Sequence, residues 1–300
     1  MFAKWAVTGI MATALALPVG AQPPDKPITI AAACSEHDGW ADPAPPARLY
    51  GNTWYVGTCG ITALLVKTSA GLVLLDGGVP EATPLVLANI RKLGFSPRQV
   101  RWILNSHEHY DHAGALGAIQ RATGARVAAG PFQRRPLASG RPDPDDPQAA
   151  LLGGHPMQPL RIARVLLSGG HLSVGGTTFT ATATPAHSPG STSWTWRACE
   201  GARCRTIAYA DSSSTISADG YRFADHPERV AAVRSGHAAI ATLPCEIIVT
   251  PHPDASDLFA RMAGAEPLIN PDACRTYAEV AMKRFADRLA AEQQAVKEPR

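Results

Sequence analysis

The chain has 300 residues, of which 45% are hydrophobic and 18% are charged, and its formal net charge at pH 7 is +3. This is an ordinary globular composition, long enough for one large domain or for two fused halves. Basic residues are spread along the chain rather than gathered in a stripe, which argues against a nucleic-acid partner.

Residues 1–21 have the pattern of a secretory signal peptide. One early lysine, Lys4, precedes an uncharged apolar run, and the run ends in small residues with Val19 and Ala21 next to the expected cleavage point. The apolar core is too short for a membrane span and no stop-transfer segment follows, although a buried N-terminal helix is an alternative. The pattern predicts export to the periplasm, with no membrane attachment after cleavage.

The first half of the mature chain alternates strand and helix patterns. Residues 22–48, rich in proline and alanine, predict an irregular surface arm, and 49–300 predict a single domain. Apolar runs predict strands and helical spacing predicts helices closed by Gly94 and Gly124. The expected strands are 61–69, 71–78 and 100–106, and the expected helices are 81–94 and 113–124.

The second half begins with a segment dense in Pro, Gly and Asp at 139–160, which predicts a long surface loop acting as a lid or a substrate wall. Strand patterns then return, with polar motifs at the strand ends, so we expect two sheets packed face to face with helices outside. The expected strands are 171–184, 191–199, 204–214 and 245–252, and the expected helices are 226–243 and one that starts at Asn270 and Pro271.

Six cysteines in an exported protein favour disulfides over free thiols, which remain the alternative. Cys199 and Cys204 enclose four residues between two strand-like runs, as expected for a bridge across a hairpin end. We predict that the other bridges are Cys34–Cys59 and Cys245–Cys274, the second of which ties a strand to the last helix. No Cys-x-x-Cys spacing supports a zinc ribbon.

The segment "NSHEHYDHAG" (105–114) holds three of the 10 histidines directly after a predicted buried strand. His107 and His109 are two residues apart, so their side chains can point the same way and share one cation. Asp111 and His112 follow a further bend and can serve a second cation, since imidazole and carboxylate are ordinary zinc ligands. Ordinary surface histidines are the alternative, and the dense spacing disfavours it.

One loop cannot close two metal sites, so further ligands are expected downstream. His187 in "TPAHSPGS" and His252 in "VTPHPDAS" each lie at a predicted strand end beside prolines and small residues. The remaining histidines lack that setting and are expected to be ordinary surface or core residues. They are His37, His155, His171, His226 and His237.

Four motifs in combination resemble the metallo-β-lactamase superfamily, and more narrowly its third subclass of exported two-zinc enzymes. They are "SHEHYDHAG", "PAHSPGSTSWTW", "IAYADSSS" and "TPHPDAS". The resemblance covers roughly Trp54 to the C-terminus and implies a four-layer αβ/βα sandwich with two mixed sheets inside and helices outside.

The resemblance also implies roles for individual residues. It assigns His107, His109 and His187 to one Zn²⁺ ion, and Asp111, His112 and His252 to the other. It further implies that Ser212, at the place of a cysteine ligand in other β-lactamases, and Ser214 contact the substrate carboxylate. Asp76 matches an aspartate that buttresses the metal loop, although a simple turn aspartate is the alternative.

The implied activity is hydrolysis of the β-lactam ring of penicillins, cephalosporins and carbapenems by a metal-bound hydroxide that Asp111 orients. If Asp211 faced the metals instead of Ser212, a lactonase or thioesterase would be favoured. A zinc-storage protein is a further, non-enzymatic hypothesis. The sequence leaves open the preference among antibiotics and the role of Tyr110, and a monomer is the default expectation.

Overall fold

The computed structural model describes residue 1 and residues 29–297, so the rest of the predicted signal peptide and residues 22–28 of the predicted arm lie outside the described residues. Within the described part of the chain, no helix is both long and apolar enough to cross a membrane.

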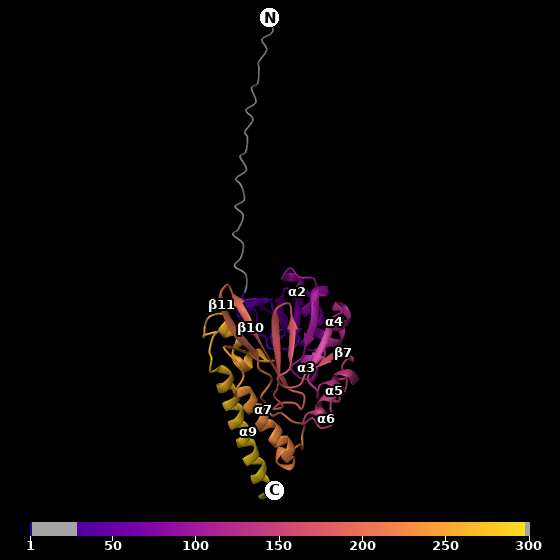
Figure 1. Ribbon diagram of the computed structural model, residues 1–300, viewed down its shortest axis with the longest axis vertical. Coiled ribbons are helices and arrows are strands. Elements are labelled where there is room, and N and C mark those ends of the chain that lie inside the picture. Colours follow the sequence, from indigo (N-terminus) through magenta and orange to yellow (C-terminus); the bar gives the residue numbers. More distant parts are fainter. Residues whose placement is uncertain (2–28, 298–300) are drawn as a thin grey trace.

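The centre of the molecule consists of two sheets (Figure 1). The seven-stranded sheet has the order β1-β2-β3-β4-β5-β6-β7, antiparallel up to β4 and parallel from β4 to β7. Its strands are β1 (Ala47–Tyr50), β2 (Thr53–Tyr55), β3 (Leu64–Thr68), β4 (Gly71–Leu75), β5 (Val100–Leu104), β6 (Arg126–Ala129) and β7 (Ile162–Val165).

The five-stranded sheet has the order β12-β11-β10-β9-β8, in which only the pair β11–β12 is parallel. Its strands are β8 (His171–Val174), β9 (Thr177–Ala183), β10 (Thr192–Glu200), β11 (Arg203–Tyr209) and β12 (Ile247–Val249). Since β10 is antiparallel to both of its neighbours, β9, β11 and β12 run in one direction and end at the same edge.

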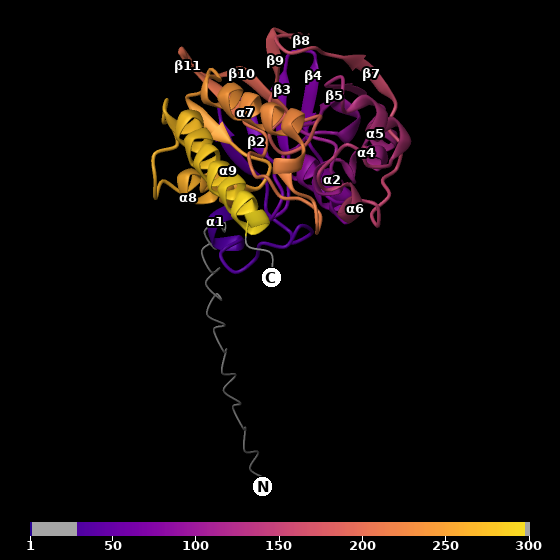
Figure 2. The same cartoon turned by 90° about the horizontal axis from the view of Figure 1, so that it is seen from below.

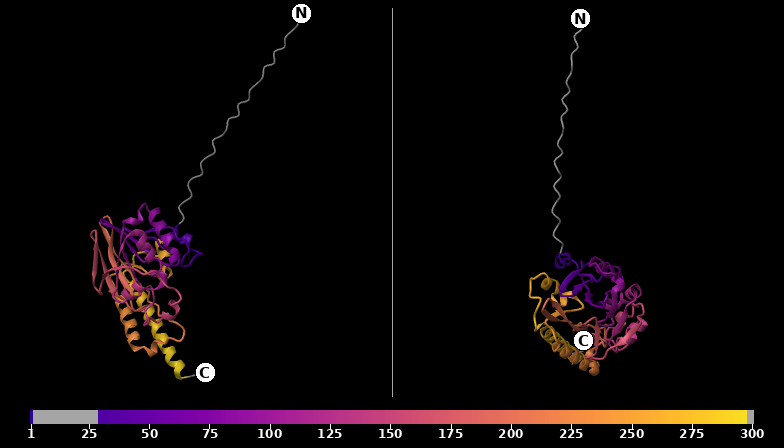
Figure 3. Two further views of the ribbon diagram at one scale, coloured as in Figure 1. Left: turned by 90° about the vertical axis from the view of Figure 1, so that its right-hand side faces the viewer. Right: turned by 45° about the horizontal axis from the view of Figure 1, so that its top comes forward.

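Helices cover the outer faces of both sheets. Helices α7 and α9 pack side by side (Figure 2), with α7 against β9 and α9 against β12, and Figure 3 shows the same pair from two further directions. The α-helices are α1 (Ile30–Ala33), α2 (Thr83–Lys92), α3 (Tyr110–Ala113), α4 (Leu116–Thr123), α5 (Arg134–Ser139), α6 (Ala149–Leu152), α7 (Pro227–Ala241), α8 (Leu258–Met262) and α9 (Ala273–Lys297). Four 3-10 turns, η1 (Pro80–Ala82), η2 (Pro97–Gln99), η3 (Phe223–Asp225) and η4 (Pro253–Ser256), complete the fold.

Strand β4 is buried on both of its faces, which explains the unbroken apolar run in its sequence. Val73 and Leu75 belong to the core between the two sheets, whereas Leu72 and Leu74 belong to the core under the outer helices α2 and α4. Side chains alternate along a strand, so a strand covered on both faces needs apolar residues at every position. The predicted αβ/βα sandwich of two mixed sheets with helices outside is therefore confirmed.

The predicted strands and helices are present, usually shorter than their sequence patterns. Other segments differ from the prediction, and neither the strand β6 nor the helix α5 was predicted. The arm predicted at 22–48 is not irregular throughout, because Thr29 caps the one-turn helix α1 and β1 already begins at Ala47. The loop predicted at 139–160 contains the short helix α6. Strand β7 was not predicted, since its residues are mostly exposed and lack an apolar run.

All three predicted disulfides are present: Cys34–Cys59, Cys199–Cys204 and Cys245–Cys274. Cys199 and Cys204 are directly paired in the β10–β11 register, as expected for a hairpin end. The bond from Cys274 fixes the start of α9 to the segment that leads into β12.

Candidate metal centre

The loop that carries the histidine motif follows β5 and is held by Asp76, the residue after β4. The Asp76 carboxylate accepts hydrogen bonds from the backbone N–H of Ser106 at 2.7 Å, from Asn105 Nδ2 at 3.0 Å and from the Tyr209 hydroxyl at 2.8 Å. Burial raises the pKa of Asp76 to about 6, against the opposing charge of His112. These hydrogen bonds tie the end of β4 to the loop that carries the histidines.

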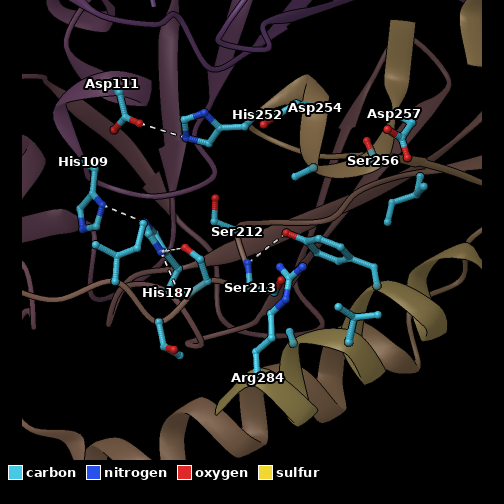
Figure 4. Close-up of a pocket in the computed structure, with 18 of the residues that line it drawn as sticks. His109, Asp111, His187, Ser212, Ser213, His252, Asp254, Ser256, Asp257 and Arg284 are labelled. Carbon is cyan, nitrogen blue, oxygen red and sulfur yellow. Dashed lines mark hydrogen bonds and ion pairs between the residues drawn. The ribbon is translucent and has the colours of Figure 1, made fainter. Parts of the chain in front are cut away.

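The predicted ligands converge from segments far apart in the sequence. One ligand atom each from His107, His109 and His187 lie within 4.8 Å of one another, and the same holds for His107, Asp111 and His112. His252 lies outside those two groups, but its Nε2 is 3.2 Å from Asp111 Oδ2. Figure 4 shows Asp111 facing His252, and His109 facing His187.

In three of the imidazoles one nitrogen is held by an oxygen atom, which turns the other toward the centre. His107 Nδ1 lies 2.8 Å from Asp211 Oδ1, and His109 Nε2 lies 2.8 Å from Asp146 Oδ2. His187 Nδ1 lies 3.0 Å from the Ser214 carbonyl, leaving its Nε2 at 3.1 Å from His109 Nδ1. Metal-binding histidines are typically fixed in this way through their second nitrogen.

Several of the inward-facing nitrogens have no hydrogen-bond partner. His107 Nε2 and His112 Nε2 are buried and unpaired, although the second lies 3.0 Å from Asp111 Oδ2 without hydrogen-bond geometry. The other nitrogen of His112, Nδ1, lies on the opposite side of the ring, 3.7 Å from Asp76 Oδ2. Burying polar atoms without partners is costly, and a divalent cation among these lone pairs would satisfy them. The imidazole and carboxylate donors therefore fit zinc or a similar ion.

The pKa shifts in the cluster run in opposite directions. Burial lowers the pKa of His109 and of His112, but Asp146 raises the first to about 9 and Asp111 raises the second. Burial, and then the charges of neighbouring histidines, hold the pKa of His107 and of His187 well below the usual range, so both rings are neutral at neutral pH. For Asp111, burial favours the protonated form, but His112 and His252 outweigh it and hold the pKa well below its usual value. Asp111 is therefore an ionised carboxylate.

Asp211 and Ser212 point to different partners, which answers a question that the sequence leaves open. Asp211 is fully buried and lies against His107 Nδ1, whereas Ser212 lines the cavity beside the cluster. Ser214 also lines this cavity, and its Oγ is 2.9 Å from His187 Nδ1.

Three polar residues at the site were not predicted. Asp146, bonded to His109, and Gln148, whose Nε2 is 3.3 Å from His187 Nε2, come from the 139–160 loop. Glu108 accepts hydrogen bonds from Gly190 N–H and Ser188 Oγ and so joins the two histidine loops. The position of Glu108 between two predicted ligands could have indicated that it belongs to the site. The sequence contains nothing that distinguishes Asp146 from the neighbouring aspartates.

Two histidines expected to be ordinary are part of the surroundings of the site. His155 lines the cavity and packs near Tyr110, with ring centroids 4.9 Å apart. His237 is buried on α7, and its Nε2 donates a hydrogen bond to the Ser213 carbonyl at 2.9 Å. Tyr110 itself is only partly buried and lines the cavity.

The cavity has a volume of about 1240 Å³ and opens next to the histidine cluster. Its wall includes Trp40, the 212–216 segment and one face of α9. A space of this size, with apolar walls and a few convergent polar groups, is typical of a small-molecule site.

Comparison with known proteins places this architecture in a family. A family model described as the metallo-beta-lactamase superfamily matches residues 56–200. The metallo-β-lactamase MIM-1 from Novosphingobium pentaromativorans is 56% identical with a TM-score of 0.87, and the match covers 89% of this chain and 99% of that chain. The chain belongs to the metallo-β-lactamase superfamily.

Other solved metallo-β-lactamases agree with the subclass predicted from the motifs. MEM-A1, a subclass B3 enzyme from a soil metagenome library, is 38% identical with a TM-score of 0.78, over 87% of this chain and 100% of that one. BJP-1, a subclass B3 enzyme of Bradyrhizobium japonicum, is 30% identical with a TM-score of 0.78, and the match covers 87% of this chain and 99% of BJP-1. The resemblance to the third subclass is thereby confirmed.

In this metallo-β-lactamase, helix α7 holds the loop that carries His187. The buried Arg229 donates hydrogen bonds to the carbonyls of Pro185 at 2.7 Å and Ala186 at 2.8 Å, directly before His187. Helix α7 comes so close that a Cβ atom on Gly236 would lie 2.5 Å from the Ala186 nitrogen. Arg229 is therefore a positioning residue for the metal loop.

We expect Arg229→Met to lower the free energy of unfolding by about 2 kcal/mol, because two buried carbonyls lose their donor. The loss is measured by urea unfolding of the metal-stripped protein, in which bound ions cannot mask it. Arg234→Met, at an exposed site on the same helix, is the matched control and should change stability by less than about 0.5 kcal/mol. Equal stability of the two variants would contradict the role given to Arg229.

Proposed function

We propose that this chain is a zinc-dependent β-lactamase that hydrolyses the ring amide of penicillins, cephalosporins and carbapenems. The observation that carries the proposal is the cluster of unpaired imidazole nitrogens and an ionised carboxylate at the edge of the cavity, in a metallo-β-lactamase fold. The solved relatives MIM-1 and MEM-A1 are metallo-β-lactamases.

We assign His107, His109 and His187 to one Zn²⁺ ion, and Asp111, His112 and His252 to a second. Ions held there supply a Lewis acid and a water of lowered pKa. The buried partners Asp211 and Asp146 keep His107 and His109 in the tautomers that direct a lone pair to the cluster.

The remaining chemistry belongs to the side chains around the cluster. The ionised Asp111 carboxylate accepts a hydrogen bond from the attacking water and orients its lone pair toward the ring carbonyl carbon. Ser212 and Ser214 line the same cavity, and their hydroxyls donate to the carboxylate that β-lactams carry. The apolar parts of the wall exclude bulk water from the reacting amide.

The alternative, an exported hydrolase of a lactone or thioester, is not favoured. It requires Asp211 to face the metal cluster, whereas the Asp211 carboxylate lies against the far nitrogen of His107. Ser212 instead occupies the cavity wall, as in the β-lactamase assignment.

The setting of the enzyme is part of the proposal. We infer that residues 1–21 are a signal peptide, that the protein is exported to the periplasm and that 49–300 acts as one monomeric domain. Three disulfides support an oxidising compartment, since such bonds are rare where thiols are kept reduced.

Metal content and carbapenem hydrolysis measured on the same sample, before and after chelation, test the function. We expect bound zinc, hydrolysis that falls to background in the stripped protein, and recovery when zinc is returned. A lactone assayed side by side should be a much poorer substrate. Full activity of the stripped sample would contradict the proposal, and zinc binding without hydrolysis of either substrate would support a storage protein.

A further inference from the structure

The cavity continues past the metal cluster along helix α9. Thr276, Tyr277, Val280 and Arg284 line this part together with the segment 212–216. Figure 4 shows Arg284 reaching up from α9 toward Ser213, on the opposite side of Ser213 from His109 and Asp111. In this view Ser212 lies between the metal cluster and Arg284.

The two ends of the cavity wall differ in charge, although Arg261 of α8 lies among the acidic residues of one end. The acidic residues Asp254, Asp257 and Glu266 lie toward η4 and α8, on the same wall as His252. In Figure 4, Asp254 and Asp257 lie far from Arg284, across the cavity. An anionic group of a ligand is therefore repelled at the acidic end and attracted to the α9 end.

Of the four cations Arg275, Lys283, Arg284 and Arg288 of α9, only Arg284 has no acidic partner among the described residues. Arg275 lies 2.7 Å from Asp272, Lys283 lies 2.7 Å from Asp287, and Arg288 lies 2.7 Å from Glu292. The positive charge of Arg284 is thus not neutralised by the protein and is available to a ligand.

The backbone around Arg284 is firmly placed. Phe285, the next residue, is buried, and Arg288, one turn later, donates to the Thr215 carbonyl and to Ser217 Oγ. These contacts fix α9 to the segment that follows Ser212 and Ser214. The backbone from which the Arg284 side chain extends is therefore fixed relative to those serines, whereas the long side chain itself must be ordered when it binds a ligand.

We propose that Arg284 is a specificity-determining residue that binds the carboxylate of the β-lactam together with Ser212 and Ser214. This inference rests on the proposed function and adds a positive charge to a carboxylate site otherwise made of hydroxyls. A guanidinium presents a planar fork of donors that matches a carboxylate. Because Arg284 is exposed, its contribution is that of a solvent-screened ion pair and depends on salt.

Steady-state kinetics of Arg284→Gln test the proposal. We expect KM for a β-lactam acid to rise about fivefold, with kcat within about twofold, because the lost interaction is present in the ground state and in the transition state alike. Arg284→Lys should recover part of the affinity. Lys283→Gln removes the same charge from the neighbouring residue, which faces Asp287 and does not line the cavity, and should leave KM unchanged.

A methyl ester of the same β-lactam has nearly the same shape as the acid but no negative charge. Comparing the two substrates therefore shows whether Arg284 acts through the charge of the carboxylate. The KM of the ester should not respond to Arg284→Gln, and added salt should raise the KM of the acid for the wild type only. Equal effects on acid and ester, or no effect on either, would overturn the proposal. If the wild type hydrolyses no β-lactam, the proposed function fails. The role of Arg284 is then tested by the affinity of metal-stripped protein for the intact acid and for the ester, since Arg284→Gln should weaken binding of the acid only.

Discussion

Asp111→Asn is expected to reduce turnover of a carbapenem by about 10²–10⁴-fold while leaving the fold intact. Asp111 is the only carboxylate in the two groups of convergent ligand atoms, and its Oδ2 lies 3.0 Å from His112 Nε2 and 3.2 Å from His252 Nε2. An amide of the same shape keeps the packing but loses the negative charge and one acceptor. The measurement is kcat at saturating zinc, with the near-ultraviolet circular dichroism spectrum as the check on folding.

Asp254→Asn is the matched control for this substitution. Asp254 is an exposed carboxylate on the same cavity wall, and among the described residues the ion pair of His252 is with Asp111 and not with Asp254. Its neutralisation should change kcat by only a few-fold. An Asp111→Asn enzyme as active as the control would remove Asp111 from the catalytic step.

Asp211→Asn is expected to weaken metal binding by about 10–100-fold. The Asp211 carboxylate accepts the proton on His107 Nδ1 at 2.8 Å and so keeps the lone pair on Nε2. An asparagine can turn its NH₂ group to Nδ1 and favour the opposite tautomer, which places a proton where the metal should bind. Zinc affinity measured by competition with a chromophoric chelator reports this directly, without reference to turnover.

The same exchange at Asp219, an exposed residue further along the chain, provides the comparison. Asp219→Asn should bind zinc as the wild type does. Unchanged affinity in Asp211→Asn would mean that the tautomer of His107 is fixed by something else, with Ser106 Oγ, at 3.3 Å from the same nitrogen, the next candidate.

The proposed metal ligands could be selected from the sequence because ligand chemistry leaves a local pattern. His107 and His109 alternate on one short segment, and His187 and His252 each follow a strand whose end lies at the same edge of the molecule. Strand direction therefore brings them together, and the sequence pattern already indicates where the strands end.

The residues that support those ligands could not be found in this way. Asp146 is one of three aspartates within four positions, and only the path of the 139–160 loop brings it to His109. Arg229 and His237 look like ordinary helix residues, because their partners, the Ala186 and Ser213 carbonyls, are backbone atoms without a sequence signature. Long-range contacts to the backbone depend on packing, which residue type alone does not encode.

The opposed directions of Asp211 and Ser212 have a consequence for how this chain can vary. Neighbouring side chains at the end of an extended segment face opposite ways, so inserting or deleting a single residue between Tyr209 and Ser212 would exchange their surroundings. A carboxylate would then enter the cavity, where an anionic antibiotic would be repelled, and a hydroxyl would take the place beside His107. The length of this junction therefore governs which chemistry the enzyme can perform, and it should tolerate exchange of residue types more readily than any change in their number.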